Sequence, residues 1–224
     1  MTRVHDMGGR FGDGPVRPEA QGIPQLSEDW QARALALTLA SGALGRWNID
    51  MSRRAREQLA PPDYARFSYF EKWTAALADL LVETGALSRE ELAAGDTTAR
   101  PMADKTLRAE QVAGVLARGG PADRDTGPAP RFAPGDVVRT LRPAGNRLVE
   151  GGHTRLPAYA AGAQGRVLRR HGSHVLPDAN AHGLGEAPEP LYAVAFPASE
   201  LWTAPEHPRD EVILDLWQSY LEPA

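Results

Sequence analysis

The ten residues PADRDTGPAP, positions 121–130, divide the chain into two halves with different apolar patterns. Prolines and glycines interrupt regular structure. Proline lacks an amide N–H donor, and glycine loses more backbone entropy than other residues when it enters a helix or strand. Before this stretch the apolar residues recur at helical spacing, and after it they alternate with a period of two. We therefore expect a helical domain at 27–120, a linker at 121–131 and a β domain at 132–224.

Helix signals fill the first half. Tyr69 and Trp73 open an apolar stripe at helical spacing, and Gly85 follows as a C-cap. Ser88 and Glu91 have the spacing of a capping box. The expected helices run from Ser27 to Gly42, from Asp50 to the residue before Pro61, from Ser68 to Glu83, over a short stretch after Ser88, and from Leu107 to Leu116.

Short alternating runs fill the second half, separated by loops rich in glycine and proline. They lie at Val137–Leu141, Val167–Arg169, Tyr192–Phe196 and Val212–Leu216. This pattern indicates a small barrel or sandwich. Residues 132–139 and 162–167 resemble the strand–loop–glycine–strand pattern of SH3-like barrels. The predicted fold class is α+β: a helical N-terminal domain with an extended arm, followed by an SH3-like β-barrel.

Residues 1–26 form a glycine- and proline-rich arm with isolated apolar residues such as Val4, Phe11 and Ile23. Such a segment cannot bury a core of its own. Its residues alone favour disorder, because chain termini usually fray. The alternative is that it lies extended across another surface.

Composition excludes several classes of function. A net charge of −4 and a pI near 5.9 argue against a general nucleic-acid or acidic-membrane binder. The absence of cysteine excludes disulfides, thiolate metal sites and a cysteine nucleophile within this chain. Residues 1–24 lack a signal-peptide pattern, and no apolar run approaches the roughly 20 residues that span a bilayer. We expect a cytoplasmic protein.

Histidines invite a metal interpretation. His171, His174 and His182, with Asp178 and Glu186 nearby, have side chains that metals accept as ligands. They fall in glycine-rich turns, however, which favours structural or surface histidines.

Phosphate binding and serine catalysis are also considered for the same half of the chain. Gly162–Gly165 lacks the lysine and the following helix of a phosphate loop, and the chain has no Gly-x-Ser-x-Gly elbow. Arg166, Arg169 and Arg170 could contact phosphates if the barrel bound nucleic acid. The acidic surroundings argue against that alternative.

Two arginine sites differ from the rest. Arg53, Arg54 and Arg56 lie within four residues, an arrangement that costs repulsion unless an anion is near. Taken alone, they favour a solvated helix face with Glu57 as partner. Arg155, close to His153, lies in a long loop, where binding groups often sit. Neither site places a general base beside a nucleophile, so the residues alone indicate an interaction subunit.

At these residues the sequence resembles the beta subunit of nitrile hydratase, and the resemblance runs from end to end. The motifs that carry it are Val4-His5-Asp6-x-Gly8-Gly9 with Gly12-x-Gly14-Pro15-Val16; Trp30; Arg53 with Glu57; Tyr64, Tyr69 and Trp73; Leu81-Val82-Glu83; Gly135–Arg139; Gly152-His153-Thr154-Arg155-x-Pro157-x-Tyr159; His171-Gly172; Pro177-Asp178; Gly183-x-Gly185-Glu186; Leu191-Tyr192-x-Val194-x-Phe196; Glu200–Trp202; and Asp215-Leu216-Trp217-x-x-Tyr220–Pro223.

The resemblance implies an enzyme that hydrates nitriles to amides at a non-corrin cobalt or non-haem iron centre. In this family an alpha subunit holds the metal through cysteines, two of them oxidised to sulfinic and sulfenic acid, and through backbone amides. The beta arm wraps around alpha, which would replace disorder as the expectation for residues 1–26. The alpha-beta pair commonly forms an (αβ)2 heterotetramer. Trp73 is closer to the cobalt-type members, so cobalt is expected.

The resemblance also implies roles for individual residues. Arg53 and Arg155 fall where family arginines bond to the oxidised cysteines, and Tyr69 where a hydroxyl reaches the metal loop. A guanidinium meets an anionic sulfur oxyacid with a planar fork. Glu57 and His153 are expected to support these arginines. The expected substrate pocket is lined by Thr38, Ile49, Ser52 and Trp73.

Departures from the family pattern concern the pocket. Thr38 and Ser52 stand where aromatic residues are frequent, so the pocket is expected to be wider or more polar. Two alternatives for the function stay open at this point. One is a subunit of a related hydratase, such as thiocyanate hydrolase, in which the matching segments are divided between two chains. The other is a non-catalytic binding or metal-delivery module.

Overall fold

The computed structural model describes residue 5, residue 26, residues 28–95 and residues 106–224. The described chain forms two compact units, which meet in the sequence between Gly119 and Gly120. The expected arm lies outside the described residues, apart from His5 and Leu26.

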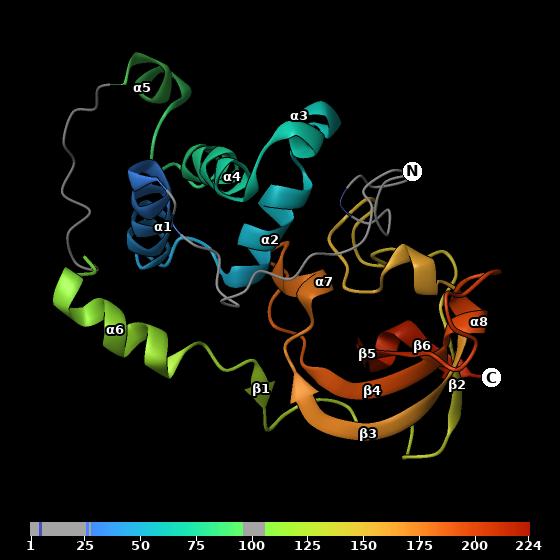
Figure 1. The fold of residues 1–224 in the computed structure, drawn as a ribbon. Helices are drawn as coiled ribbons and strands as arrows, with labels where there is room; N and C mark the ends of the chain where they lie inside the picture. Colours follow the sequence, from blue (N-terminus) through green and yellow to red (C-terminus); the bar gives the residue numbers. More distant parts are fainter. Residues whose placement is uncertain (1–4, 6–25, 27, 96–105) are drawn as a thin grey trace. The chain divides into compact units, whose positions relative to one another are not determined.

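The first unit is helical, as the sequence predicts (Figure 1). Its helices are α1 (Asp29–Gly42), α2 (Ile49–Glu57), α3 (Pro61–Arg66), α4 (Tyr69–Glu83), α5 (Arg89–Ala94) and α6 (Ala109–Arg118). The expected capping box at Ser88 is confirmed: the Glu91 N–H donates to the Ser88 hydroxyl at 3.1 Å, and the Ser88 N–H donates to the Glu91 carboxylate at 2.8 Å. No helix within the described ranges is both long and apolar enough to cross a bilayer.

Helix α3 begins where the sequence predicts only an interruption. Pro61 and Pro62 end the preceding helical pattern, but they also occupy the first turn of α3. Proline is well suited to that position, because its backbone torsion is already helical and its missing N–H would have had no partner there. The same two residues therefore stop one helix and start the next.

Helix α4 is the centre of this unit and packs against both α1 and α2. Its buried side chains include Phe70, Ala76, Leu77 and Leu80. Ala55 of α2 packs against Ala76 and Leu80, with Trp47 at the edge of the cluster. Because alanine is small, α2 can lie close against α4 at this point.

The second unit holds an antiparallel sheet of six strands: β1 (Asp123–Arg124), β2 (Val137–Thr140), β3 (Gln164–His174), β4 (Glu189–Pro197), β5 (Glu211–Trp217) and β6 (Leu221–Pro223). The strand order is β5-β4-β3-β2-β6, and β1 pairs with the far end of β3. Short helical turns connect them: η3 (Ala158–Ala160), α7 (Pro177–Asn180), α8 (Ala198–Leu201) and η4 (Gln218–Tyr220). β1 falls inside the stretch expected to be linker.

The strand pairings among residues 106–224 do not close this sheet into a barrel, so the expected SH3-like barrel is not confirmed. β5 and β6 are the two edges of the pairing path, and β6 pairs only with β2 over three residues. Alternating apolar residues predict that a strand has one buried face, but they carry no information about which strands lie at the edges. Two register shifts between β3 and β4 bend the sheet without closing it.

β3 and β4 curve together in Figure 1, and their side chains contribute to the core of the second unit. Residues Glu189–Phe196 of β4 are buried without interruption, which is the pattern of a central strand covered on both faces. The largest buried apolar side chains are Tyr192, Phe196, Leu156, Leu216, Val138, Val167 and Val194. The long connection 141–157 contains no helix or strand, and Leu156 near its end is buried in the core.

Candidate functional site

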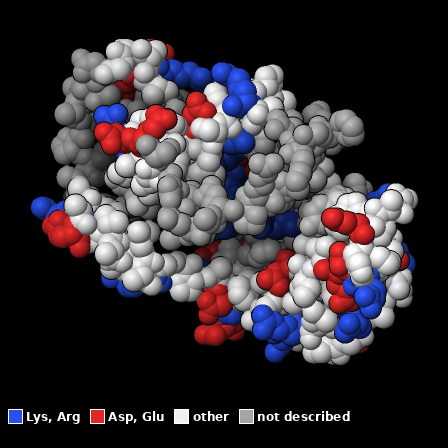
Figure 2. Space-filling view, viewed as in Figure 1, with Lys and Arg blue, Asp and Glu red and all other residues white. Residues whose placement is uncertain are grey.

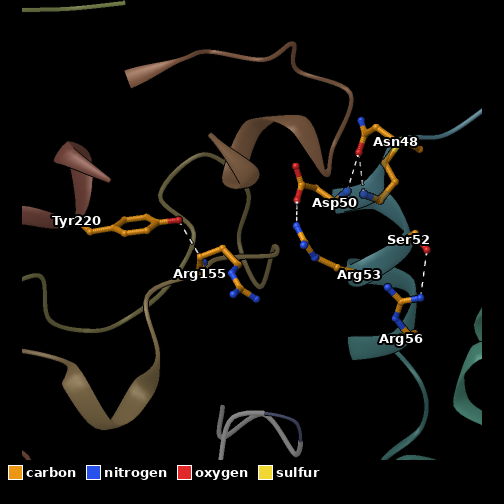
Figure 3. Close-up of polar contacts among 8 residues, drawn as sticks. Asn48, Asp50, Ser52, Arg53, Arg56, Arg155 and Tyr220 are labelled. Carbon is orange, nitrogen blue, oxygen red and sulfur yellow. Dashed lines mark hydrogen bonds and ion pairs between the residues drawn. The ribbon is translucent and has the colours of Figure 1, made fainter. Parts of the chain in front are cut away.

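Arg53 is held by an ion pair within α2. The helix begins at Asn48, whose side-chain oxygen accepts the amide N–H groups of Asp50 and Met51 at 3.0 and 2.9 Å. Asp50 is thereby placed in the first turn, and its Oδ1 lies 3.0 Å from Nη1 of Arg53 (Figure 3). The side chain of Arg53 is 44% exposed and that of Asp50 only 5%. The acid is thus a buried anchor for a partly exposed base.

The other two arginines of α2 have separate partners. Arg54 forms an ion pair with Glu83 at the end of α4. Arg56 donates from Nη1 to the Ser52 hydroxyl at 3.2 Å, and its guanidinium carbon lies 4.8 Å from the centre of the Trp73 ring. Burial lowers the pKa of Arg56 below its ordinary value, while Tyr69 opposes that shift. The residues alone suggested that the three charges share one solvated face. The structure instead gives them separate partners.

Glu57 and the aromatic residues of α4 complete this region. Glu57 Oε2 lies 3.6 Å from Nε2 of His5, whose ring meets Tyr64 edge-on at 6.2 Å. The Tyr69 and Trp73 rings are 5.3 Å apart, and the ring of Tyr69 remains exposed, like the side chain of Ile49. The structure thus brings Ser52 and Trp73 together through Arg56, a residue to which the sequence assigned no role. Its i,i+4 spacing from Ser52 was the available signal.

Thr38 lies on α1, where its hydroxyl donates to the carbonyl of Ala34 at 2.8 Å. A hydroxyl that donates to the preceding turn leaves the threonine methyl as its outward group. At this position the helix therefore presents a small and mainly apolar side chain.

Arg155 belongs to the second unit, in the connection 141–157. Its amide N–H donates to the Tyr220 hydroxyl at 3.1 Å (Figure 3). That hydroxyl donates in turn to Asp178. Next to it, the amide N–H of His153 donates to Nε2 of His182 at 2.9 Å, and the carbonyl of His153 accepts from Asn146 at 2.6 Å. The backbone around Arg155 is therefore fixed by buried side chains from several elements.

The carboxyl group of Asp178 is the most perturbed acid of this unit. Burial raises the pKa of Asp178 to about 6, against the opposing effect of its hydrogen bonds to Tyr220 and Thr154. Burial likewise raises the pKa of Tyr220 well above its usual range, and the neighbouring Asp178 adds to that shift. Tyr220 therefore stays protonated and can donate. The sequence named both residues only within family motifs and gave neither a role.

Metal ligation by this chain is not supported by the side-chain geometry. His171 Nε2 lies 2.8 Å from Asp215, and Glu186 bonds to Arg124. Within the described ranges no three His, Cys, Asp or Glu side chains are placed to hold a metal ion. The donor set of the described residues does not fit a bound metal.

The phosphate-binding alternative also lacks support. Arg166, Arg169 and Arg170 are exposed on β3. On the face of the second unit that Figure 2 shows, however, basic and acidic side chains are interspersed. A nucleic-acid surface gathers positive charge in one patch.

Comparison with known proteins places both units in one family. Residues 1–115 match the family "nitrile hydratase beta subunit, N-terminal", and residues 121–223 match its C-terminal counterpart. The low-molecular weight cobalt-containing nitrile hydratase subunit beta of Rhodococcus rhodochrous is 35% identical, with 100% of both chains covered. The nitrile hydratase subunit beta of Pseudomonas putida is 36% identical over 100% of both chains.

A third relative is the cobalt-containing nitrile hydratase subunit beta of Pseudonocardia thermophila, 33% identical over 99% of this chain and 96% of its own. Among solved structures, the recombinant apo-enzyme of thiocyanate hydrolase from Thiobacillus thioparus is 25% identical with a TM-score of 0.39, and covers 45% of this chain and 82% of its own. The matches to both halves and the full-length identities agree, and this chain belongs to the nitrile hydratase beta subunit family.

Proposed function

We propose that this chain works in a complex with a nitrile hydratase alpha subunit, which hydrates nitriles to amides at a metal centre that alpha holds. The observation that carries the proposal is the Asp50–Arg53 pair on α2. One nitrogen of the guanidinium is engaged by a buried carboxylate, and the side chain is otherwise partly exposed. A guanidinium held in this way is oriented to receive a second anion.

The proposed second anion is an oxidised cysteine of alpha. Sulfinate and sulfenate groups carry projecting oxygens, which suit the planar donor fork of arginine. A hydrogen bond to a charged group contributes about 1.5–3 kcal/mol. In this proposal Arg53 and Arg155 each donate to these oxygens, Tyr69 donates from its exposed hydroxyl to the metal loop, and Glu57 and His153 support the two arginines.

Cobalt is the proposed metal and iron the alternative. Two of the full-length relatives are named as cobalt-containing, which supports cobalt. When bound in alpha, the metal supplies Lewis acidity toward the nitrile. The part played by this chain is to orient the anionic sulfur ligands and to form a wall of the substrate pocket.

Thr38, Ile49, Ser52 and Trp73 are the proposed pocket residues. The Ser52 hydroxyl accepts from Arg56, and the Thr38 hydroxyl donates within its own helix. Both hydroxyls therefore have a partner within this chain. Small side chains with engaged hydroxyls make the proposed pocket wider rather than more polar, which favours bulky nitriles.

A partner surface on the helical unit supports the same proposal. Leu37, Ile49 and Tyr69 are large apolar side chains with more than half of their surface exposed, on α1, α2 and α4. Exposed apolar groups of this size are typical of interaction surfaces. We propose that alpha covers them, that residues 1–26 wrap around alpha, and that two αβ pairs form a cytoplasmic (αβ)2 heterotetramer.

The domain limits are part of the proposal as well: an arm at 1–26, a helical domain at 27–120, a linker at 121–131 and a β domain at 132–224. We further propose that the β domain is a half-open relative of SH3-like barrels. In its support, β5 continues through the single turn η4 directly into β6, so that the two edge strands are joined by only three residues.

Co-expression with an alpha subunit in cobalt medium, followed by purification through this chain, tests the function. The expected result is a stoichiometric, cobalt-containing complex that converts a simple nitrile to its amide. A complex that acts on thiocyanate instead would indicate the related hydratase. A chain that purifies alone, or that binds alpha without turnover, would indicate the metal-delivery module.

A further inference from the structure

We propose that Tyr220 and Asp178 are positioning residues, which hold the backbone at Arg155 and so aim its guanidinium at the oxidised-cysteine centre. This inference rests on the function proposed above. It concerns two residues that do not themselves touch the reacting groups and that act through Arg155 alone.

The geometry is a chain of hydrogen bonds across the second unit. The Arg155 N–H donates to the Tyr220 hydroxyl at 3.1 Å, and this hydroxyl donates to Oδ1 of Asp178. The Thr154 side chain also bonds to both Tyr220 and Asp178. Tyr220 comes from η4 and Asp178 from α7, so two elements distant in the sequence meet at the hydroxyl that accepts the Arg155 amide.

Burial makes this chain of bonds rigid. Tyr220 is 3% exposed and Asp178 is 4% exposed. The Tyr220 ring packs edge-on against Trp217 at 6.0 Å, which helps to hold the ring in place. Buried polar groups are costly to separate, because a broken bond leaves a donor or acceptor without water. The Arg155 amide is therefore tied to the core of the unit.

Residues 141–157 contain no helix or strand, and besides Tyr220 the neighbouring Leu156 anchors them, because its side chain is buried in the core of the unit. Side-chain contacts to His182 at the His153 amide and to Asn146 at the His153 carbonyl fix the loop further, and so does the backbone bond from Gly152 to Val149. A displacement of the backbone is carried directly to the guanidinium at the end of the Arg155 side chain. Misplacement by about 1 Å can reduce turnover about a hundredfold.

The ionisation of Asp178 should change the strength of the hydrogen bond between the Tyr220 hydroxyl and the Arg155 amide. A carboxylate accepts more strongly than a carboxylic acid, and a hydroxyl that donates to a strong acceptor becomes a better acceptor itself. The groups that face Asp178 are Tyr220 from η4, Thr154 and His153 from the loop, and Glu189 from β4. Burial raises the pKa of Asp178 to about 6, so the carboxylate form prevails above that pH.

The test compares Tyr220→Phe with Tyr192→Phe in the assembled complex. Tyr192 is a matched control: its ring is fully buried, and its hydroxyl accepts the amide N–H of Arg131 at 3.2 Å and donates to Gln218 at 2.9 Å. Both variants lose one buried hydroxyl that accepts from backbone amides, although the Arg131 N–H also donates to Oε1 of Gln218 at 2.8 Å. Only Tyr220→Phe releases the amide of Arg155.

We expect Tyr220→Phe to lower kcat about tenfold, as the loss of one buried hydrogen bond implies, with KM changed less than about twofold. Tyr192→Phe should keep kcat within about twofold of the wild type. Hydrogen exchange gives a readout that does not depend on activity: Tyr220→Phe should speed exchange at residues 152–157, and Tyr192→Phe at residues 129–133. In the pH profile of kcat, Asp178→Asn should remove an acidic limb near pH 6.

Equal losses of kcat in the two tyrosine variants, or unchanged exchange at 152–157 in Tyr220→Phe, would overturn the inference. Should Tyr220→Phe not assemble with alpha, Asp178→Asn takes its place: its neutral amide accepts more weakly than the carboxylate, so exchange at 152–157 should still be faster than in the wild type. A wild-type complex without nitrile hydration would refute the proposed function instead, while the exchange measurement would still decide whether Tyr220 holds the loop.

Discussion

Asp50 and Arg53 form an ion pair across one turn of α2 in which the acid is buried and the base is partly exposed. Their Oδ1 and Nη1 atoms are 3.0 Å apart (Figure 3). Surface pairs with this spacing contribute little stability, typically below about 1 kcal/mol. Here the buried partner has a different consequence, because it fixes the direction in which the guanidinium points.

Arg53→Lys keeps the charge at this position but loses the planar fork. We expect kcat of the complex to fall about a hundredfold, the usual effect of removing one preorganised donor from a reaction centre. Steady-state kinetics with a simple nitrile, alongside the cobalt content and the oxidation state of the alpha cysteines, measures this. Unchanged turnover at a normally oxidised centre would contradict the role of Arg53.

Asp50→Asn tests the carboxylate that orients Arg53, rather than the guanidinium of Arg53 itself. An amide holds the guanidinium less firmly than a carboxylate does, so we expect kcat to fall about tenfold, in proportion to one weakened charged hydrogen bond. The matched control is Asp63→Asn, which removes an i,i+3 partner of Arg66 on α3 at 2.7 Å, where both side chains are exposed. Similar kinetics for the two variants would argue against an anchoring role for Asp50.

Ser52→Phe restores an aromatic residue where the family often has one. If Ser52 lines the pocket, the added ring should exclude bulky nitriles more than small ones. We expect the ratio of kcat/KM for benzonitrile to that for acetonitrile to fall about tenfold, within the range that one misfitted apolar group costs. Each variant serves as its own control, because only the ratio is compared. An unchanged ratio would place Ser52 outside the pocket.

The stability of the complex should depend on Asp178 in a defined pH range. The pKa of its carboxyl is raised to about 6 in the folded chain, from about 3.9 in an unfolded one. The folded state therefore binds the proton more tightly, and the stabilisation from protonation is present in full below about pH 3.9 and is lost as the pH rises through 6. The shift corresponds to about 3 kcal/mol.

Thermal unfolding of the wild type and of Asp178→Asn between pH 4 and pH 7 measures this. The variant cannot titrate at this position, so its deficit in Tm relative to the wild type should be larger at pH 4 than at pH 7. A deficit independent of pH would mean that the carboxyl of Asp178 does not titrate in this range.

Gly152→Ala should distort the loop that carries Arg155. A Cβ at Gly152 would lie 2.8 Å from Nε2 of His182, 2.8 Å from the Val149 carbonyl oxygen and 2.9 Å from the Asn146 amide nitrogen. We expect a lower Tm and a loss of kcat of at least about tenfold, because displaced backbone carries the guanidinium with it. The control is Gly145→Ala in the same connection, where a Cβ meets nothing within 4 Å. Equal effects of the two substitutions would show that the contact with His182 is not needed.

The sequence by itself determined the local structure and the family. The helical spacing of Tyr69 and Trp73 and the capping box at Ser88 depend only on residues within a turn or two, so they can be read directly. The family motifs are likewise strings of neighbouring residues. The position of Arg53 in its motif was therefore available before any contact of its side chain was known.

Only the tertiary structure decided which side chains hold the candidate site residues. Tyr220 and Asp178 are 42 positions apart, yet the Tyr220 hydroxyl bonds both to Asp178 and to the amide of Arg155, and Arg56 lies over Trp73 from another helix. The sequence also did not predict which strands form the edges of the sheet. Apolar periodicity indicates which face of a strand is buried, but not which strands pair with it. Contacts between distant residues depend on how whole elements pack, which no local pattern records.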